Sequence, residues 1–154
     1  MELPRLRFPD YKFKLRTDTP DGQSLKIFDI IRGKFISLTP EEWVRQHLIH
    51  FLVHERGYPA TLLGVEKKVL VNRLERRFDL LVYSRDFNPV LLAECKSPSV
   101  SLNQDVFDQA ARYNLTLGAK YFVLSNGMET ICCTIDHEKQ NYQFIEEVPF
   151  YDKL

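Results

Sequence analysis

The sequence predicts an α/β domain with a mixed central β-sheet flanked by helices. Residues 90–96 (VLLAECK), a helical pattern over 102–117 and residues 120–125 (KYFVLS) have the length of a β–α–β crossover, so the two strands should be parallel. Residues 77–84 (RFDLLVYS) lie too close to 90–96 for anything but antiparallel pairing. A sheet that contains both kinds of pair is mixed.

An arm and a hairpin are predicted in the first part of the chain. Residues 1–24 mix proline, basic and aromatic residues and are expected to form an irregular N-terminal arm, followed by a single domain over 25–154. Two apolar runs, 25–31 and 35–38, flank Arg32-Gly33-Lys34 and predict a short β-hairpin.

The segment after this hairpin has the signals of a helix. Thr39 is a good N-cap, Pro40 suits the first helical position and Glu42 completes a capping box. Apolar residues then recur at helical spacing, and Gly57 and Pro59 are expected to stop the helix.

The second half of the chain is predicted to be mostly strands. Pro98 prevents the strand over 90–96 from running on, and Gly118 caps the helix over 102–117. Asn126-Gly127 predicts a turn. Further strands are predicted over 61–71, 130–135 and 142–146.

The composition is typical of a soluble globular domain. The chain has 154 residues, of which 44% are hydrophobic and 27% are charged. It has no run of roughly 18 apolar residues and no apolar secretion signal, so the cytoplasm is the expected location. Cys95, Cys132 and Cys133 fit neither a disulfide framework nor a zinc pattern and are expected to be reduced, buried thiols.

The balance of charged side chains neither predicts nor excludes nucleic-acid binding. The chain has 21 basic and 21 acidic side chains, and this balance argues mildly against tight, stand-alone DNA binding. It does not exclude a local basic face, because the distribution of charge matters more than its sum. Solvated strand ends and loops are the simpler account of the residues that could form such a face: Lys67, Lys68, Arg73, Arg76 and Arg77.

Two carboxylates and an ammonium are predicted to converge on the central strands. If the hairpin of 77–84 and 90–96 pairs symmetrically about its turn, Asp79 lies opposite Glu94 and points to the same face. Lys96 shares that face with Glu94, because strand side chains alternate. Opposed carboxylates among apolar residues need a compensating cation, either Lys96 or a divalent metal such as Mg²⁺ or Mn²⁺.

These residues also have a simpler interpretation. Asp79 and Glu94 would then lie solvated at strand ends, with Arg76, Arg77 and Lys96 as surface ion-pair partners. A slip of one residue in the register would also separate the two carboxylates.

The helix over 102–117 adds a second pair of polar residues. Gln109 and Tyr113 are four residues apart, so they are neighbours on one helical side and can reach the end of the strand that holds Glu94. A core tyrosine and an edge glutamine are the alternative.

These residues resemble the PD-(D/E)xK nuclease superfamily. Asp79 followed by Glu94-Cys95-Lys96 matches its D…(E)-x-K signature. Gln109-Ala-Ala-Arg-Tyr113 resembles the Q-x-x-x-Y motif that follows the nuclease core in restriction subunits of type I restriction enzymes and in RecB-like nucleases. Most of the chain, from LTPEEWVRQ to LSNGMET, is similar to stand-alone type I restriction enzyme R-subunit N-terminal domain proteins.

The resemblance implies a restriction-endonuclease-like fold and a Mg²⁺-dependent deoxyribonuclease, an endonuclease acting in restriction, defence or DNA repair. Asp79, Glu94 and the backbone carbonyl of Cys95 would hold Mg²⁺, for which Mn²⁺ could substitute. Lys96 would orient or activate the attacking water and steady the charge that develops on the phosphate.

It also implies roles for two helices. Gln109 and Tyr113 would position the nucleic-acid backbone or the metal site. The superfamily often has an acidic residue on its first helix. Glu41 is favoured for this role over Glu42, because Glu42 has the capping function.

The chain departs from the family pattern in two ways. Phe78 stands before Asp79 where the motif usually has proline. No Walker A sequence is present, so cutting coupled to translocation is expected to need another polypeptide. The expected partners are DNA and either a second copy of the chain or separate motor and specificity subunits. A non-catalytic DNA- or protein-binding module on the same fold, or an RNA nuclease, is the alternative.

One further group lies on the first helix. His47, His50 and His54 fall on one side with Trp43, at a spacing that could bind a transition metal. A solvated or partner-facing flank is the preferred interpretation.

Overall fold

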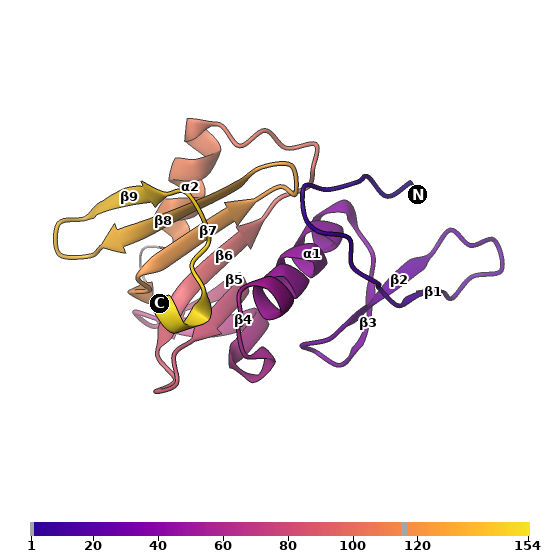
Figure 1. Cartoon of the computed structure of the whole chain (residues 1–154), viewed down its shortest axis with the longest axis horizontal. Helices are drawn as coiled ribbons and strands as arrows, with labels where there is room; N and C mark the ends of the chain where they lie inside the picture. Colours follow the sequence, from indigo (N-terminus) through magenta and orange to yellow (C-terminus); the bar gives the residue numbers. More distant parts are fainter. Residues whose placement is uncertain (1, 115–116) are drawn as a thin grey trace.

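Two β-sheets and two α-helices organise the residues that the computed structural model describes, 2–114 and 117–154 (Figure 1). The small sheet has antiparallel strands β1 (Leu15–Thr17), β2 (Leu25–Asp29) and β3 (Lys34–Ser37). Helices α1 (Pro40–Glu55) and α2 (Gln104–Asn114) accompany the large sheet. Its strands lie in the order of their numbers: β4 (Leu63–Val71), β5 (Leu74–Tyr83), β6 (Pro89–Cys95), β7 (Tyr121–Ser125), β8 (Thr130–Asp136) and β9 (Asn141–Ile145). Short 3₁₀ turns lie at Ala60–Leu62 and Tyr151–Lys153.

The large sheet is mixed, as the sequence predicts. Strands β6 and β7 are parallel and are joined through α2, whereas the other neighbours are antiparallel. The symmetric register of β5 and β6 is confirmed at Leu80, which pairs with Ala93. Nearer the turn it was wrong: Tyr83 pairs with Pro89 and not with Val90, because a β-bulge shifts the register after Val82.

Some predicted boundaries are corrected. The N-terminal arm is not wholly irregular, since Leu15–Thr17 pairs with β2. Strand β5 begins at Leu74, earlier than predicted, because Asn72 and Arg73 adopt positive φ and form a tight turn after β4. The predicted helix over 102–117 is observed as α2, and residues 115–116 lie outside the described part. The division into an arm and a domain over 25–154 stays a prediction.

Helix α1 begins and ends where its sequence signals predict. The Thr39 hydroxyl oxygen accepts a hydrogen bond from the Glu42 N–H at 3.0 Å, which satisfies one of the free donors of the first turn. The Glu42 carboxylate turns inward to Arg32 and Arg45, so it has a different role from the one predicted in the capping box. The helix ends at Glu55, before Gly57.

The large sheet is covered on both faces. Side chains alternate along the central strands, so Leu80 packs in the core shared with α1 and Leu81 packs in the core shared with α2. Leu91 and Leu92 divide in the same way. Burial on both faces explains why β5 and β6 read as nearly continuous apolar runs.

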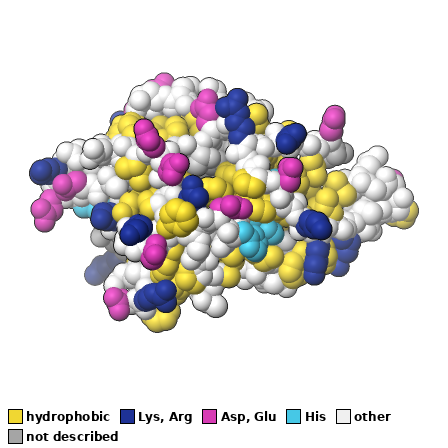
Figure 2. Space-filling model, in the orientation of Figure 1, with side chains coloured by type: hydrophobic (Ala, Val, Ile, Leu, Met, Phe, Trp, Pro, Cys, Tyr) yellow, Lys and Arg dark blue, Asp and Glu magenta, His cyan; other side chains and the backbone are white. Residues whose placement is uncertain are grey.

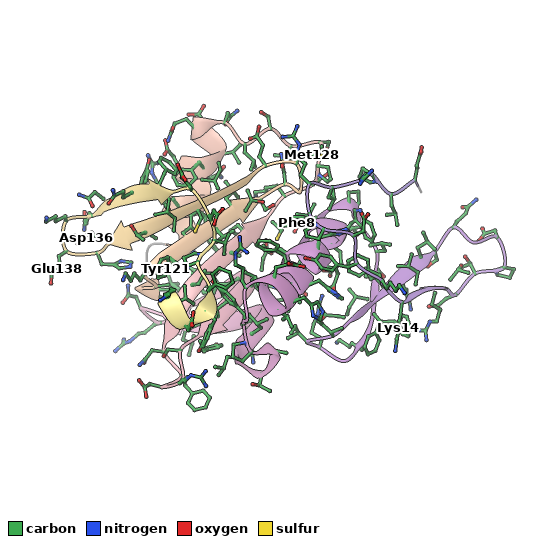
Figure 3. All side chains as sticks on the ribbon, viewed as in Figure 1. Phe8, Lys14, Tyr121, Met128, Asp136 and Glu138 are labelled. Atoms are coloured by element: carbon green, nitrogen blue, oxygen red, sulfur yellow. The ribbon has the colours of Figure 1, made fainter. Side chains whose placement is uncertain are left out.

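The N-terminal arm packs against α1 and the β7–β8 turn. Leu6 is buried in the core, and the Arg7 N–H donates to the Gly127 carbonyl at 2.7 Å. Phe8 and Met128 both pack against this core (Figure 3). Gly127 has φ of +84°, and a Cβ at this position would lie 2.7 Å from Leu6, so the close approach of the arm requires glycine.

The arm also covers the histidines of α1. His47 and His50 are buried, and the Tyr11 ring centroid lies 5.3 Å from that of His50. The Phe13 ring centroid lies 4.7 Å from both imidazoles. The predicted solvated flank was therefore wrong for these two residues, whereas His54 is exposed.

Other sequence expectations can be compared with burial. Cys95, Cys132 and Cys133 are free and buried, as predicted. Among the described residues, no helix combines the length and the apolar character that crossing a membrane requires.

Candidate active site

Most of the predicted site residues line one cavity. It has a volume of about 590 Å³ and lies between α2 and the ends of the central strands. Its walls are formed by Glu66, Arg77, Asp79, Glu94, Lys96, Val100, Val106, Gln109, Ala110 and Tyr113. Residues from β4, β5, β6 and α2, far apart in the sequence, therefore meet at one place. Glu41 does not line this cavity.

Asp79 is fixed where the β5–β6 ladder stops. The last pair is Leu80 with Ala93, so Asp79 and Glu94 occupy the next register position without a ladder pair. Asp79 uses its side chain instead, and Oδ2 accepts a hydrogen bond from the Cys95 N–H at 2.8 Å. The predicted convergence of Asp79 and Glu94 is thus observed as a shared cavity, with a side chain in place of a backbone partner.

The residues after β6 are held against β7. The Lys96 N–H donates to the Ser125 carbonyl at 2.8 Å, which continues the parallel pairing one residue beyond the strand. This contact fixes the backbone of Lys96 and leaves its side chain to line the cavity with Glu94.

The oxygen donors of the site fit a hard divalent cation. Asp79 and Glu94 contribute carboxylates to the cavity. The Cys95 N–H faces Asp79, and its carbonyl is expected on the same side because both groups of a strand residue point one way. Among the described residues, no three His, Cys, Asp or Glu side chains form a metal-binding group. Mg²⁺ commonly keeps several waters, so two carboxylates and a carbonyl suit it.

Cys95 is suited to a backbone role only. Burial raises the pKa of its thiol well above the usual value, and the nearby Asp79 charge raises it further. The thiol therefore stays protonated and is not a nucleophile.

Tyr113 holds α2 to the backbone of β5. Its hydroxyl accepts from the Arg77 N–H at 3.1 Å and donates to the Arg77 carbonyl at 3.0 Å. The ring packs against Phe78, so Tyr113 combines the predicted proximity to the site with a packing role. Gln109 is exposed at the cavity wall.

Glu41 lies in a neighbouring hollow of about 480 Å³, whose wall also includes Arg45, Glu66 and Ser97. Partial burial raises the pKa of Glu41, and the charge of Asp79 raises it further. The charge of Asp79 therefore acts on Glu41, although Glu41 does not line the main cavity.

The family described as Type I restriction enzyme R protein N terminus matches residues 40–149. The chain belongs to this family. The matched region runs from the start of α1 to beyond β9, so it contains every predicted site residue of this R protein N-terminal domain.

The fold of this chain is similar to that of a solved structure. It is a fragment described as an HsdR subunit of a type I restriction enzyme from Vibrio vulnificus YJ016, with 22% identity and a TM-score of 0.56. The match covers 76% of this chain and 24% of that chain, and it shows the shared fold. No curated protein matches the chain.

The domain also has a buried ionic network that sequence reasoning missed. The Arg45 side chain is 6% exposed, and its guanidinium contacts Glu42, Glu66 and Asp79. Arg32 joins the same network through Glu42 and Glu66. The sequence has one indication of this network. Arg45 lies beside Val44 and four residues before Ile49, so a charged residue stands on the apolar side of α1.

Glu66 lies opposite Asp79 on the β4 side. Its neighbours Val65 and Lys67 pair with β5 on either side of that position. Glu66 has φ of +51°, a strained conformation that costs about 1–3 kcal/mol for a residue other than glycine. Burial acts to raise the pKa of Glu66, but a hydrogen bond from Arg77 and the charges of Arg45 and Arg77 lower it overall. Its carboxylate is therefore held charged beside the site.

Proposed function

We propose that this R protein N-terminal domain is a Mg²⁺-dependent deoxyribonuclease with a PD-(D/E)xK centre. The observation that supports this most is the cavity shared by Asp79, Glu94, Lys96, Gln109 and Tyr113. Spacing and motif in the sequence predict the same five residues. A set of solvated strand ends would not need to converge in this way.

The chain's own residues have separable tasks in this proposal. Asp79, Glu94 and the Cys95 carbonyl would hold the ion. When bound, Mg²⁺ polarises a phosphate oxygen and lowers the pKa of water. Lys96, fixed by its backbone contact to β7, would hold the attacking water and offset the negative charge that grows on the phosphate.

Substrate contacts would come from the rim of the cavity. Gln109 is exposed, and the Arg77 side chain is 58% exposed. Both can donate hydrogen bonds to phosphate oxygens. Basic and acidic side chains are interspersed on the face seen in Figure 2, in keeping with the zero net charge. The proposed affinity for DNA is therefore modest and is supplemented by a second copy or by separate motor and specificity subunits.

A second candidate is a non-catalytic DNA- or protein-binding module. Asp79 favours it, because Oδ2 accepts from Cys95 and Oδ1 lies 3.4 Å from the Arg45 guanidinium. A carboxylate that already has two partners does not require a metal ion. Metal binding therefore separates the two candidates.

The test is cleavage of supercoiled, linear and single-stranded DNA, and of RNA, with Mg²⁺ or Mn²⁺. We expect activity that needs metal and falls by about 10²–10³-fold in Asp79→Ala and in Lys96→Ala. Lys120→Ala is the matched control, because Lys120 is exposed and outside the cavity wall. It should retain wild-type activity.

Two other results would change the conclusion. Activity that persists in both variants would mean that the site is misplaced or that the preparation contains another nuclease. Absence of cleavage together with absence of Mn²⁺ binding in calorimetry would favour the binding module.

A further inference from the structure

Arg45 is buried among three carboxylates. Its Nε donates to Glu42 Oε2 at 2.8 Å and its Nη2 donates to Glu42 Oε1 at 3.0 Å. Nη2 also lies 3.4 Å from Glu66 Oε1, and Nη1 lies 3.4 Å from Asp79 Oδ1. One guanidinium thus joins α1 to β4 and to β5.

The guanidinium is suited to this place. Burial acts to lower the pKa of Arg45, but hydrogen bonds to Glu42 and the charges of Glu42 and Asp79 raise it above its usual value. Arg45 is therefore permanently charged. Its planar fork can hold several acceptors at fixed angles, which an ammonium cannot do.

Both oxygens of Asp79 have a fixed partner as a result. Oδ2 is held by the Cys95 N–H and Oδ1 by Arg45. The carboxylate is thereby oriented toward the end of β6, where Glu94 and Lys96 enter the cavity. Glu66, in its strained conformation opposite Asp79, holds Arg45 from the other side.

We propose that Arg45 is a positioning residue that orients Asp79 for metal binding at the site. The inference rests on the proposed function. Arg45 does not contact substrate in this proposal, and it acts through Asp79 alone. Outer residues that orient a metal ligand typically change metal affinity by about 10–100-fold when they are replaced.

Arg32 offers a matched control. Its side chain is 15% exposed, and its guanidinium contacts Glu42 and Glu66, as that of Arg45 does. It contacts Asp29 where Arg45 contacts Asp79. Replacement of either arginine disturbs the same network, but only the replacement of Arg45 loosens Asp79 directly.

The experiment compares wild type, Arg45→Lys and Arg32→Lys by two measurements. The first is hydrogen exchange of the Cys95 amide, followed by NMR. The second is Mn²⁺ affinity by calorimetry without DNA. In Arg45→Lys we expect faster Cys95 exchange and Mn²⁺ binding that is about 10–100-fold weaker. In Arg32→Lys both should stay close to wild type, even if the melting temperature falls equally.

The outcomes are distinguishable. If wild type binds Mn²⁺ and the two variants behave alike, Arg45 has a structural role only and this inference is overturned. If wild type binds no Mn²⁺, the proposed function fails and the inference fails with it. If Arg45→Lys does not fold, Glu42→Gln is measured in place of Arg45→Lys, because it weakens the contact between Arg45 and its closest partner. An unchanged Cys95 exchange rate and Mn²⁺ affinity in that variant would also overturn the inference.

Discussion

A single hydroxyl replaces part of the β-ladder at Arg77. On one side Arg77 pairs with Lys68 of β4. On the other side the ladder with β6 has already ended, and the Tyr113 hydroxyl takes both the N–H and the carbonyl. One side chain therefore closes the gap at the cavity wall and fixes α2 to the sheet.

Replacement of Tyr113 by phenylalanine tests this contact. Tyr113→Phe keeps the ring and removes the hydroxyl, so the free energy of unfolding should fall by about 1 kcal/mol, as water partly replaces the lost bonds at this half-exposed position. Urea denaturation measures the change. Tyr142→Phe is the control, because its hydroxyl makes only 3.4 Å contacts, and an equal loss in both variants would contradict the role of Tyr113.

At the residue scale, the sequence predicts some site residues and not others. Asp79, Glu94 and Lys96 follow from strand pairing across one short turn, which is local information. Arg45 and Glu66 could not be assigned in this way, because their partners come from the β2–β3 turn, α1, β4 and β5. Their contacts depend on how α1 packs against β4 and β5, and the spacing of residues in the sequence does not predict that packing.

At the element scale, the arm has no hydrophobic period that would predict its place on α1. Its aromatic residues nevertheless bury His47 and His50. Burial, with a smaller contribution from the charges of His54 and His47, lowers the pKa of His50 to about 4. Burial also lowers the pKa of His47.

These shifts predict a fold that weakens in mild acid. The unfolded state takes up protons on histidine below about pH 6.5, whereas the folded state resists until about pH 4. Stability should therefore fall as the pH drops from 6.5 toward 4, by roughly 1 kcal/mol per pH unit for one histidine. Thermal unfolding at several pH values measures the slope.

Two histidine variants test whether the buried histidines of α1 cause this loss of stability in acid. His50→Gln should flatten the slope, because it removes the group with the most depressed pKa. His137→Gln should retain the slope, because His137 lies on the β8–β9 turn and bonds to Ala119. Identical slopes in wild type and His50→Gln would contradict the prediction.

At the scale of the whole molecule, the mixed sheet was predictable because two connection lengths determine it. A turn that is too short for a crossover forces β5 and β6 to be antiparallel, and a segment long enough for a helix allows β6 and β7 to be parallel. Strand β1, which adds to the predicted hairpin of β2 and β3, was not predictable, because its residues are exposed and show no apolar alternation.

Metal binding should stabilise the molecule as a whole. At Mn²⁺ concentrations about ten times Kd, linkage predicts about 1.4 kcal/mol, or a rise in melting temperature of roughly 3–6 °C for a chain of this length. Glu94→Gln should abolish the rise, because it removes one proposed ligand. Glu138→Gln, in an exposed turn, should keep it. A rise of the same size in Glu94→Gln would place the ion elsewhere.

The N-terminal arm and the C-terminal turn contact opposite ends of the large sheet (Figure 1). The arm reaches Gly127, beside the cavity end, through Arg7. At the other end, the Tyr151 hydroxyl donates to the Tyr83 carbonyl, next to the β5–β6 turn. A tether attached after Leu154 would therefore hold the protein to a bead or sensor surface by the end of the sheet that is farther from the cavity, whereas a tether on the arm would hold it by the nearer end.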